Sequence, residues 1–242
     1  MPHGHPDYGI SAPIKTEYAL SDLGELAARL GSIDTFDRRG NVIFLDPFEN
    51  TLNKWETTLV GTGASAALAA DMARNGAYSL KLVTGNLTNN YAAITNRLAY
   101  PVISRLGLEF SSYLYGLYGH IYLLFELYDG TYRHSFGIRY TAVTNTWEYR
   151  SSNGSWLMFS GPPINLHYGA LFHTFKLVID PENNHYARFI LNNIQTDISN
   201  YAGWLVSNPL TPRILTYICC TTLQDASHTI YLDDVIITQN EP

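Results

Sequence analysis

Apolar and polar residues alternate along most of this chain from about residue 48 onward. Segments 78–85 (YSLKLVTG), 107–116 (GLEFSSYLYG) and 229–238 (TIYLDDVIIT) read as strands of about 5 to 9 residues, and Gly, Asn, Pro and Asp turns separate such segments. The pattern is typical of half-buried β-strands joined by turns, and it does not fit alternating strands and helices. It predicts an all-β sandwich or jelly roll over residues 46–242.

The first 45 residues follow a different pattern. Residues 1–19 contain three prolines and no periodicity, which predicts an extended arm. Residues 20–32 (LSDLGELAARLGS) place leucines on one face before Gly31, which predicts one short helix. Residues 32–46 alternate on either side of DRRGN, which predicts a hairpin. We therefore divide the chain into an N-terminal assembly or anchoring part, residues 1–45, and a sandwich, residues 46–242.

Composition supports the β prediction and removes some classes of partner. The chain has 18 Tyr, 10 Phe and 4 Trp and only 15% charged residues, which suits pleated, half-buried surfaces. A formal net charge of −6 offers no basic stripe for a phosphate backbone, so no nucleic acid partner is expected. There is no apolar run of membrane-spanning length and no signal-peptide pattern, so we expect no membrane span and no secretion.

The two cysteines are neighbours in the segment TYICCTTL. On a strand, Cys219 and Cys220 point to opposite faces and cannot easily bridge each other. We expect buried free thiols, as in proteins that mature in a reducing cytoplasm.

Four segments resemble known jelly-roll domains. Residues 172–193 (FHTFKLVIDPENNHYARFILNN) resemble the strand, turn and strand of concanavalin A-like folds of the laminin-G and glucanase type. Residues 46–55 (DPFENTLNKW) with 74–82, and the closing YLDDVIIT, are similar to the ends of carbohydrate-binding modules with that sandwich. The resemblance covers roughly residues 46–238 and implies a concanavalin A-like jelly-roll β-sandwich. That fold hosts lectins, hydrolases and structural modules, so it leaves the function open.

The same resemblance implies one structural calcium ion. In such modules the Phe of the opening motif enters the core, and the adjacent Glu joins an Asp of the last strand around the ion. Glu49 and Asp234, with the neighbouring Asp233, match these positions. Calcium prefers several hard oxygens, and backbone carbonyls near residues 79–82 would add to the carboxylates. The alternative is that all three are solvated turn charges.

One turn gathers candidate glycan-binding residues. Residues 144–159 (TNTWEYRSSNGSWLMF) supply Trp147, Tyr149, Asn153 and Trp156. Aromatic rings stack on sugars, and amides fix hydroxyl groups. The alternative is that Trp147 and Trp156 are core partners across two strands.

Catalytic patterns are not found in the sequence. A jelly-roll glucanase would carry two carboxylates a few residues apart on one strand face, and no strand shows that pair. Serine-hydrolase, phosphate-loop and metalloprotease motifs are also missing. We therefore expect no enzyme and no catalytic residues.

The N-terminal stretch, MPHGHPDYG with residues 20–49, resembles uncharacterised proteins encoded among the structural genes of tailed bacteriophages. An extended arm before a compact β module is suited to lacing subunits together. The main hypothesis is a non-enzymatic bacteriophage virion protein, a capsid-surface decoration or accessory protein. It would assemble in the host cytoplasm, form a homo-oligomer and contact capsid or other virion proteins through residues 1–45. The alternatives are a carbohydrate-binding module on a tail, which would meet surface glycans, and a jelly-roll glycoside hydrolase.

Overall fold

The computed structural model describes residues 39–99, 103–116, 118–166 and 171–242. The predicted arm (1–19), the predicted helix (20–32) and the first half of the predicted hairpin lie outside the described residues. No helix in the described ranges is long and apolar enough to span a membrane.

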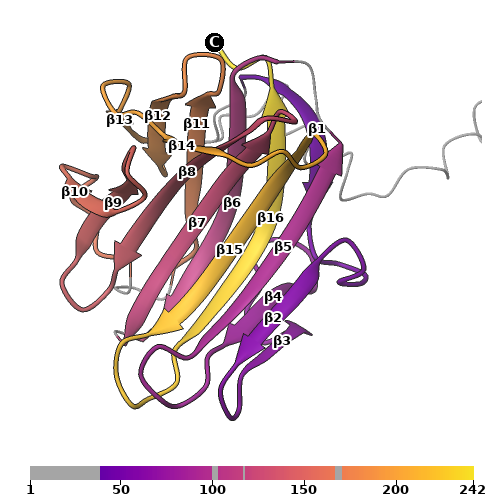
Figure 1. Cartoon of the computed structure of the whole chain (residues 1–242). Coiled ribbons are helices and arrows are strands. Elements are labelled where there is room, and N and C mark those ends of the chain that lie inside the picture. The colour runs from indigo at the N-terminus through magenta and orange to yellow at the C-terminus, as the bar shows by residue number, and fades with distance from the viewer. Residues whose placement is uncertain (1–38, 100–102, 117, 167–170) are drawn as a thin grey trace, which may run out of the picture. The chain divides into compact units, whose positions relative to one another are not determined.

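Two antiparallel sheets make up the described part of the chain, and Figure 1 shows their long strands stacked one layer over the other. Sheet A has the order β13 (Ile194–Asp197), β12 (His185–Leu191), β11 (His173–Asp180), β6 (Leu106–Tyr115), β16 (Thr229–Gln239), β4 (Ser79–Val83) and β3 (Ser65–Ala69), and β1 (Asn41–Asp46) also pairs with β16. Sheet B has the order β10 (Trp156–Phe159), β9 (Thr146–Arg150), β8 (Tyr132–Thr141), β7 (Gly119–Tyr128), β15 (Arg213–Thr222), β5 (Tyr91–Ala99) and β2 (Glu56–Val60), and β14 (Trp204–Ser207) also pairs with β8. The predicted all-β jelly-roll sandwich is confirmed.

The core lies between the two sheets and contains the alternate residues that the sequence pattern indicates. On β7 the buried side chains are Ile121, Leu123, Phe125 and Leu127, and the residues between them point away from the core. Tyr186 of β12 spans the core to sheet B: its hydroxyl accepts the Gly137 N–H at 2.9 Å and donates to the Arg150 carbonyl at 2.7 Å.

The last strand, β16, is central to sheet A. On one side, the first half of β16 pairs with β4 and its second half pairs with β1. On the other side, β6 pairs with both halves. The register shifts at Asp233 and Asp234, where β4 gives way to β1, and Asp234 adopts a φ of 50°. Asp tolerates this left-handed backbone better than most residues, so the bulge places two adjacent carboxyl groups at one point of the sheet.

The second half of the predicted hairpin forms β1. Gly40 has the positive φ expected of the turn, at 84°, but β1 pairs with β16, nearly 200 residues away. β1 is therefore part of sheet A. Phe48, which follows it, is fully buried and packs against Trp55, as the resemblance implied.

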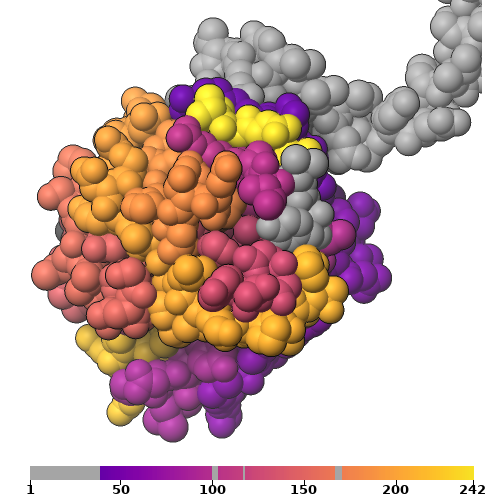
Figure 2. Space-filling model, turned by 45° about the horizontal axis from the view of Figure 1, so that its top comes forward, coloured from indigo at the N-terminus to yellow at the C-terminus, as the bar shows by residue number. Residues whose placement is uncertain are grey.

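Buried charges hold the last residues of the chain to sheet A. The Glu241 carboxylate lies 2.8 Å from Lys176 Nζ and 2.5 Å from Arg188 Nη2, and its side chain is fully buried. Lys176 also donates to the Arg39 carbonyl at 3.2 Å. Figure 2 shows the last residues (yellow) lying beside the first described ones (indigo). Both ends of the described chain thus meet at one ionic cluster.

The substitution Glu241→Gln should lower the free energy of unfolding by about 3 kcal/mol, because it removes the buried negative charge that Lys176 and Arg188 share. Urea denaturation checks this. The matched control is Glu56→Gln, which removes an ion pair to Arg97 whose side chains are 68% and 39% exposed. The control should change stability by less than about 1 kcal/mol, and an equally small effect at Glu241 would contradict the buried cluster.

His228 predicts an acid-sensitive fold. It is fully buried, and neither ring nitrogen has a hydrogen-bond partner among the described residues. Burial, with His120 nearby, lowers the pKa of His228 from 6.5 to about 4. As the pH falls, His228 takes up a proton in the unfolded chain before it does so in the folded protein. The contribution of neutral His228 to the free energy of unfolding is therefore fully present above pH 6.5 and is lost toward pH 4. The loss should reach about 3 kcal/mol. Urea denaturation at about pH 8 and about pH 4.5 measures it, and His228→Asn should show a smaller difference between the two pH values.

Candidate functional site

The outward face of sheet B carries all the charge of its strands. These strands contain five arginines, three glutamates and no lysine or aspartate. Each of the eight alternates with core residues or pairs with an outward residue, so each points away from the core; they are Arg97, Arg133, Arg139, Arg150, Arg213, Glu56, Glu126 and Glu148. The face therefore has two more positive than negative charges, on a chain whose formal net charge is −6.

Three of these arginines alternate with two tryptophans in a continuous stack. The Arg133 and Arg150 guanidinium carbons each lie 4.6 Å from the centroid of the Trp204 ring. Arg150 and Arg139 lie 5.9 and 4.7 Å from the centroid of the Trp156 ring. We call these five residues the arginine–tryptophan stack. They come from β8, β9, β10 and β14, so the sheet brings together side chains up to 71 positions apart in the sequence.

Two glycines make room for the indole rings. A Cβ on Gly137 would lie 3.0 Å from Trp156, and a Cβ on Gly154 would lie 3.0 Å from Trp204. Trp156 is directly opposite Arg150 in the β10–β9 register. The ladder pairing therefore fixes the order of the rings and cations, and the glycines let the rings lie close to the sheet.

Only some of the face's arginines are neutralised within the chain. Arg139 makes two hydrogen bonds to the Glu148 carboxylate, both at 2.7 Å. Arg133 is 3.9 Å from Glu126. Among the described residues, Arg150 and Arg213 have no carboxylate partner within ion-pair distance, and their Nε atoms are buried without a hydrogen-bond partner. Burial lowers the pKa of Arg150, but a guanidinium keeps its proton in proteins, so both groups remain cationic.

The centre of the face is aromatic and uncharged. The Tyr122 ring lies 5.8 Å from both the Trp156 and the Tyr217 rings, measured between centroids. Burial raises the pKa of both tyrosines, so their hydroxyls stay protonated. Burial, with Arg139 nearby, lowers the pKa of His120 to about 4, so its imidazole is neutral at pH 7. The face thus offers ring surfaces, neutral hydrogen-bonding groups and fixed cations.

The structure does not bring the four predicted glycan-binding residues onto one surface. Trp147 is 4% exposed and packs in the core against Phe189, so its ring faces away from the outer face. Tyr149 also points inward and stacks on Tyr201 at 4.1 Å between centroids. The Asn153 side chain accepts the Ser155 N–H at 2.9 Å and organises the turn.

Trp156 alone of the four lies on the outer face. Trp147 and Trp156 are not core partners across the strands, because Trp147 is opposite Phe159, and Trp156 is opposite Arg150. Sequence reasoning missed the arginines and Trp204. A signal was present in β8 (YRHSFGIRYT), where Arg133 and Arg139 occupy the positions that alternate with core residues.

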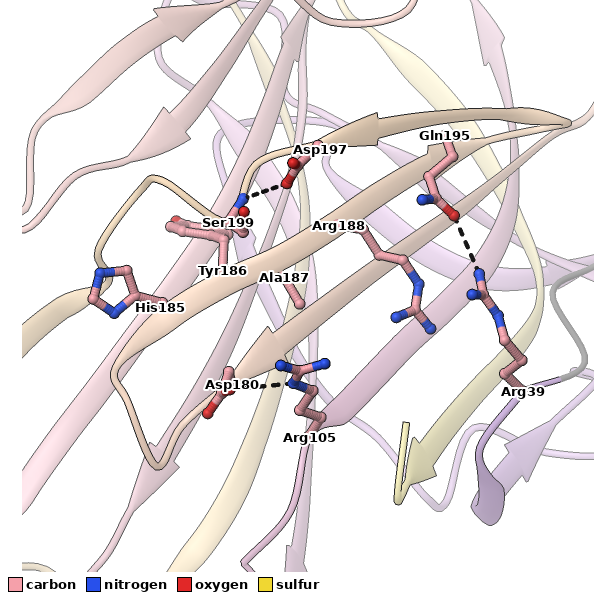
Figure 3. Close-up of a pocket in the computed structure, with 10 residues that line it drawn as sticks. All are labelled: Arg39, Arg105, Asp180, His185, Tyr186, Ala187, Arg188, Gln195, Asp197 and Ser199. Carbon is pink, nitrogen blue, oxygen red and sulfur yellow. Dashed lines mark hydrogen bonds and ion pairs between the residues drawn. The ribbon is translucent and has the colours of Figure 1, made fainter. Parts of the chain in front are cut away.

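A second candidate is a pocket of about 390 Å³ at the edge of sheet A, where β12 and β13 meet Arg39 and Arg105. Figure 3 shows three contacts among its lining residues, from Arg105 to Asp180, from Arg39 to Gln195 and from Ser199 to Asp197. Arg105 Nε donates to Asp180 at 3.1 Å, and Arg39 donates to Gln195 at 3.2 Å. Because these groups already have partners within the chain, the pocket is a weaker candidate than the outer face of sheet B.

The three predicted calcium ligands converge on one loop. Glu49 accepts the Ala77 N–H at 3.0 Å, and Asp233 accepts the Arg74 N–H at 2.8 Å. Asp234 accepts from the Arg74 guanidinium at 2.6 Å. Burial, with Asp234 next to it, raises the pKa of Asp233 to about 7, and burial raises that of Asp234. The structure thus places the three carboxylates around residues 74–78.

The fit to calcium is partial. Acidic oxygens gathered at a buried bulge are the kind of ligand that calcium prefers. Protein donors occupy them here, and no group of three or more His, Cys, Asp or Glu side chains in the described ranges has the arrangement of a metal site. The calcium ion therefore stays a prediction.

Comparison with known proteins gives matches of structure only. No protein-family model and no curated protein matches the chain. The cellulose-induced protein Cip1 matches with a TM-score of 0.58 and 17% identity, over 81% of this chain and 96% of that one. An endo-β-1,4-glucuronan lyase from the fungus Trichoderma reesei matches with a TM-score of 0.58 and 11% identity, over 82% and 96%. Lectin I-B4 from Griffonia simplicifolia matches with a TM-score of 0.52 and 10% identity, over 81% and 98%. At these identities the likeness establishes the fold, a β-sandwich of the concanavalin A-like kind.

Proposed function

We propose that this protein binds carbohydrate through the outer face of sheet B. The observation that carries the proposal is the arginine–tryptophan stack beside Tyr122 and Tyr217. Sugars are bound by aromatic rings together with side chains that hydrogen-bond to hydroxyls. A preorganised set of planar groups also loses little side-chain entropy on binding.

Proteins of similar fold support the proposal. Two of them are named as a glucuronan lyase and a lectin, so their names connect them with carbohydrate. Their sequences are too different from this chain for any residue to be carried over. The proposal therefore rests on the chain's own side chains, and the shared fold makes carbohydrate a reasonable ligand class.

The proposed activity is binding without hydrolysis. A glycosidase needs two carboxyl groups about 5 to 9.5 Å apart. Glu126 lies four residues from Tyr122 along β7. Glu148 lies two strands away from Tyr122, because Tyr122 is opposite Arg139 on β8, and Arg139 is opposite Glu148 on β9. The two positions are thus about 13 Å apart along the strands and about 10 Å across them. Glu148 is also held by Arg139, and Glu126 accepts from Ser135 at 2.8 Å.

The virion hypothesis stays a prediction beside this proposal. It depends on residues 1–45, of which 1–38 lie outside the described residues, and the expected homo-oligomer and capsid contacts depend on it too. A glycan-binding face and an N-terminal anchor are compatible, because they would use different parts of the chain. Carbohydrate binding was the alternative function, and it is now the leading one.

We also propose that calcium binds between Glu49 and the Asp233–Asp234 bulge. Asp233 and Asp234 are adjacent and buried, and the pKa of each is raised. Ionising both carboxyl groups in the folded protein therefore costs free energy. Arg74 offsets part of that charge. A calcium ion would offset more of it and would join the first and last strands of sheet A to the 74–78 loop.

Removing either tryptophan of the stack should abolish carbohydrate binding while leaving the fold intact. In affinity electrophoresis through gels containing plant and bacterial polysaccharides, Trp156→Ala and Trp204→Ala should migrate as in gels without polysaccharide. Their free energies of unfolding should fall by less than about 2 kcal/mol, since both rings are partly exposed.

The control for this experiment is Trp147→Ala, the buried tryptophan one strand away. It should lose about 3 to 5 kcal/mol of stability and still be retarded wherever it is folded. Equal retardation of the wild type, Trp156→Ala and Trp204→Ala would contradict the proposed face.

Chelation tests the calcium proposal. If the ion binds, EDTA should lower the melting temperature of the purified protein by several degrees, and added calcium should restore it. A ligand at 100 times its dissociation constant contributes about 2.7 kcal/mol. Asp234→Asn should remove the response, and Asp225→Asn, in a distant exposed turn, should keep it. A melting temperature that is the same in EDTA and in calcium would refute the site.

A further inference from the structure

Resting on the proposed function, we infer that the ligand is an acidic polysaccharide, and that Arg150 and Arg213 bind its anionic groups. The shared chemistry is a row of carboxylates or sulfate esters along an extended chain.

Two aromatic rings hold Arg150 in place. Its guanidinium lies between the rings of Trp204 and Trp156, at 4.6 and 5.9 Å from their centroids. Stacking of this kind occupies the faces of the planar group and leaves its N–H edge to donate. No described carboxylate lies within ion-pair distance of it, and its Nε lacks a hydrogen-bond partner. Because Nε is buried, an anion on the ligand would pair with the terminal N–H groups of this partly exposed side chain.

Arg213 repeats this arrangement at another point of the face. Its guanidinium carbon lies 4.8 Å from the centroid of the Tyr128 ring, and its Nε also lacks a hydrogen-bond partner among the described residues. Arg150 and Arg213 are thus two partly exposed cations on one face, each backed by an aromatic ring and neither within ion-pair distance of a described carboxylate. Anionic groups of a ligand would supply both with a partner.

The separation of the two arginines indicates a polymer. Across the sheet, Arg150 on β9 is in register with Gly137 on β8, Leu124 on β7 and Tyr217 on β15. Tyr217 is therefore three strand spacings from Arg150. Arg213 is four residues farther along β15 than Tyr217. The positions are therefore about 14 Å apart across the strands and about 13 Å along them. One sugar ring cannot reach both, whereas a chain lying obliquely across the face can.

Charge elsewhere on the chain restricts an acidic ligand to this face. The formal net charge is −6, while the strands of sheet B carry a surplus of two positive charges. The surplus of positive charge on these strands contrasts with the net negative charge of the chain, and it favours this face for an anionic polymer. Binding should weaken with added salt, since exposed charge interactions are screened.

The test uses the full-length protein and pairs of polymers that differ only in charge. Polyglucuronate is compared with the same polymer after its carboxyl groups are reduced to alcohols, and heparin with its desulfated form. Affinities are measured by isothermal titration calorimetry at low and moderate salt. We expect tighter binding to polyglucuronate than to its reduced form, a preference for heparin over its desulfated form if sulfate is the natural group, and weaker binding at higher salt.

Variants locate the effect. Arg150→Gln and Arg213→Gln should each weaken binding to the preferred acidic polymer about tenfold or more, as expected for the loss of a charge-assisted hydrogen bond. Arg150→Lys should recover only part of the affinity, because lysine keeps the charge but not the stacked planar fork. The matched control is Arg105→Gln, which removes the same charge from the edge of sheet A. It should bind like the wild type, and melting temperatures confirm that every variant is folded.

The outcomes separate this inference from the proposed function. Equal affinity for acidic and reduced polymers, with Arg150→Gln unchanged and Trp156→Ala inactive, would overturn the inference and leave carbohydrate binding standing. Equal weakening by Arg105→Gln and Arg150→Gln would also overturn it, since net charge alone would then explain the effect. Absence of binding to every polymer would overturn both.

Discussion

The apolar space between the two sheets determines where every functional side chain of this protein lies. Each long strand must bury one set of alternate residues, and a slip of one residue would expose the whole set. On β7 this places Ile121, Leu123 and Phe125 inside, and Tyr122 and Glu126 outside. The residues that alternate with the core residues therefore form the outer face of sheet B. They give that face its charges and its aromatic rings.

The arginine–tryptophan stack then depends on how the strands pair. Cation–π contacts contribute about 0.5 to 2 kcal/mol each, so the stack stabilises the edge strands β10 and β14 while it orients its arginines. The Tyr186 hydroxyl supports the stack from below, because it binds the backbone of Gly137 and Arg150 from the core side. The face is thus held from both sides of the sheet, so the proposed binding surface is preformed.

The bulge in β16 joins parts of the chain that are far apart in sequence. At Asp233 and Asp234 the strand changes its partner from β4 to β1, and the two carboxyl groups bind the loop that contains Arg74. At the far end of β16, Glu241 binds Lys176 and Arg188. β16 and the residues that follow it therefore carry two groups of buried charge, and both secure sheet A rather than the face of sheet B.

The sequence by itself determined the class of fold, because strand-like segments and turn residues are local properties that can be recognised along the chain. The burial of Phe48 was implied by the resemblance to known jelly-roll modules, and the structure confirms it. The sequence also singled out Trp156, which lies on the outer face of sheet B, and Glu49, Asp233 and Asp234, whose carboxyl groups meet at residues 74–78. Only the tertiary structure decided that Trp147 and Tyr149 are core residues, since the turn between them and Trp156 does not reveal which strand face meets the other sheet. Only the structure united Arg150 with Trp204, 54 positions later, because antiparallel pairing makes neighbours of residues that no spacing along the chain connects.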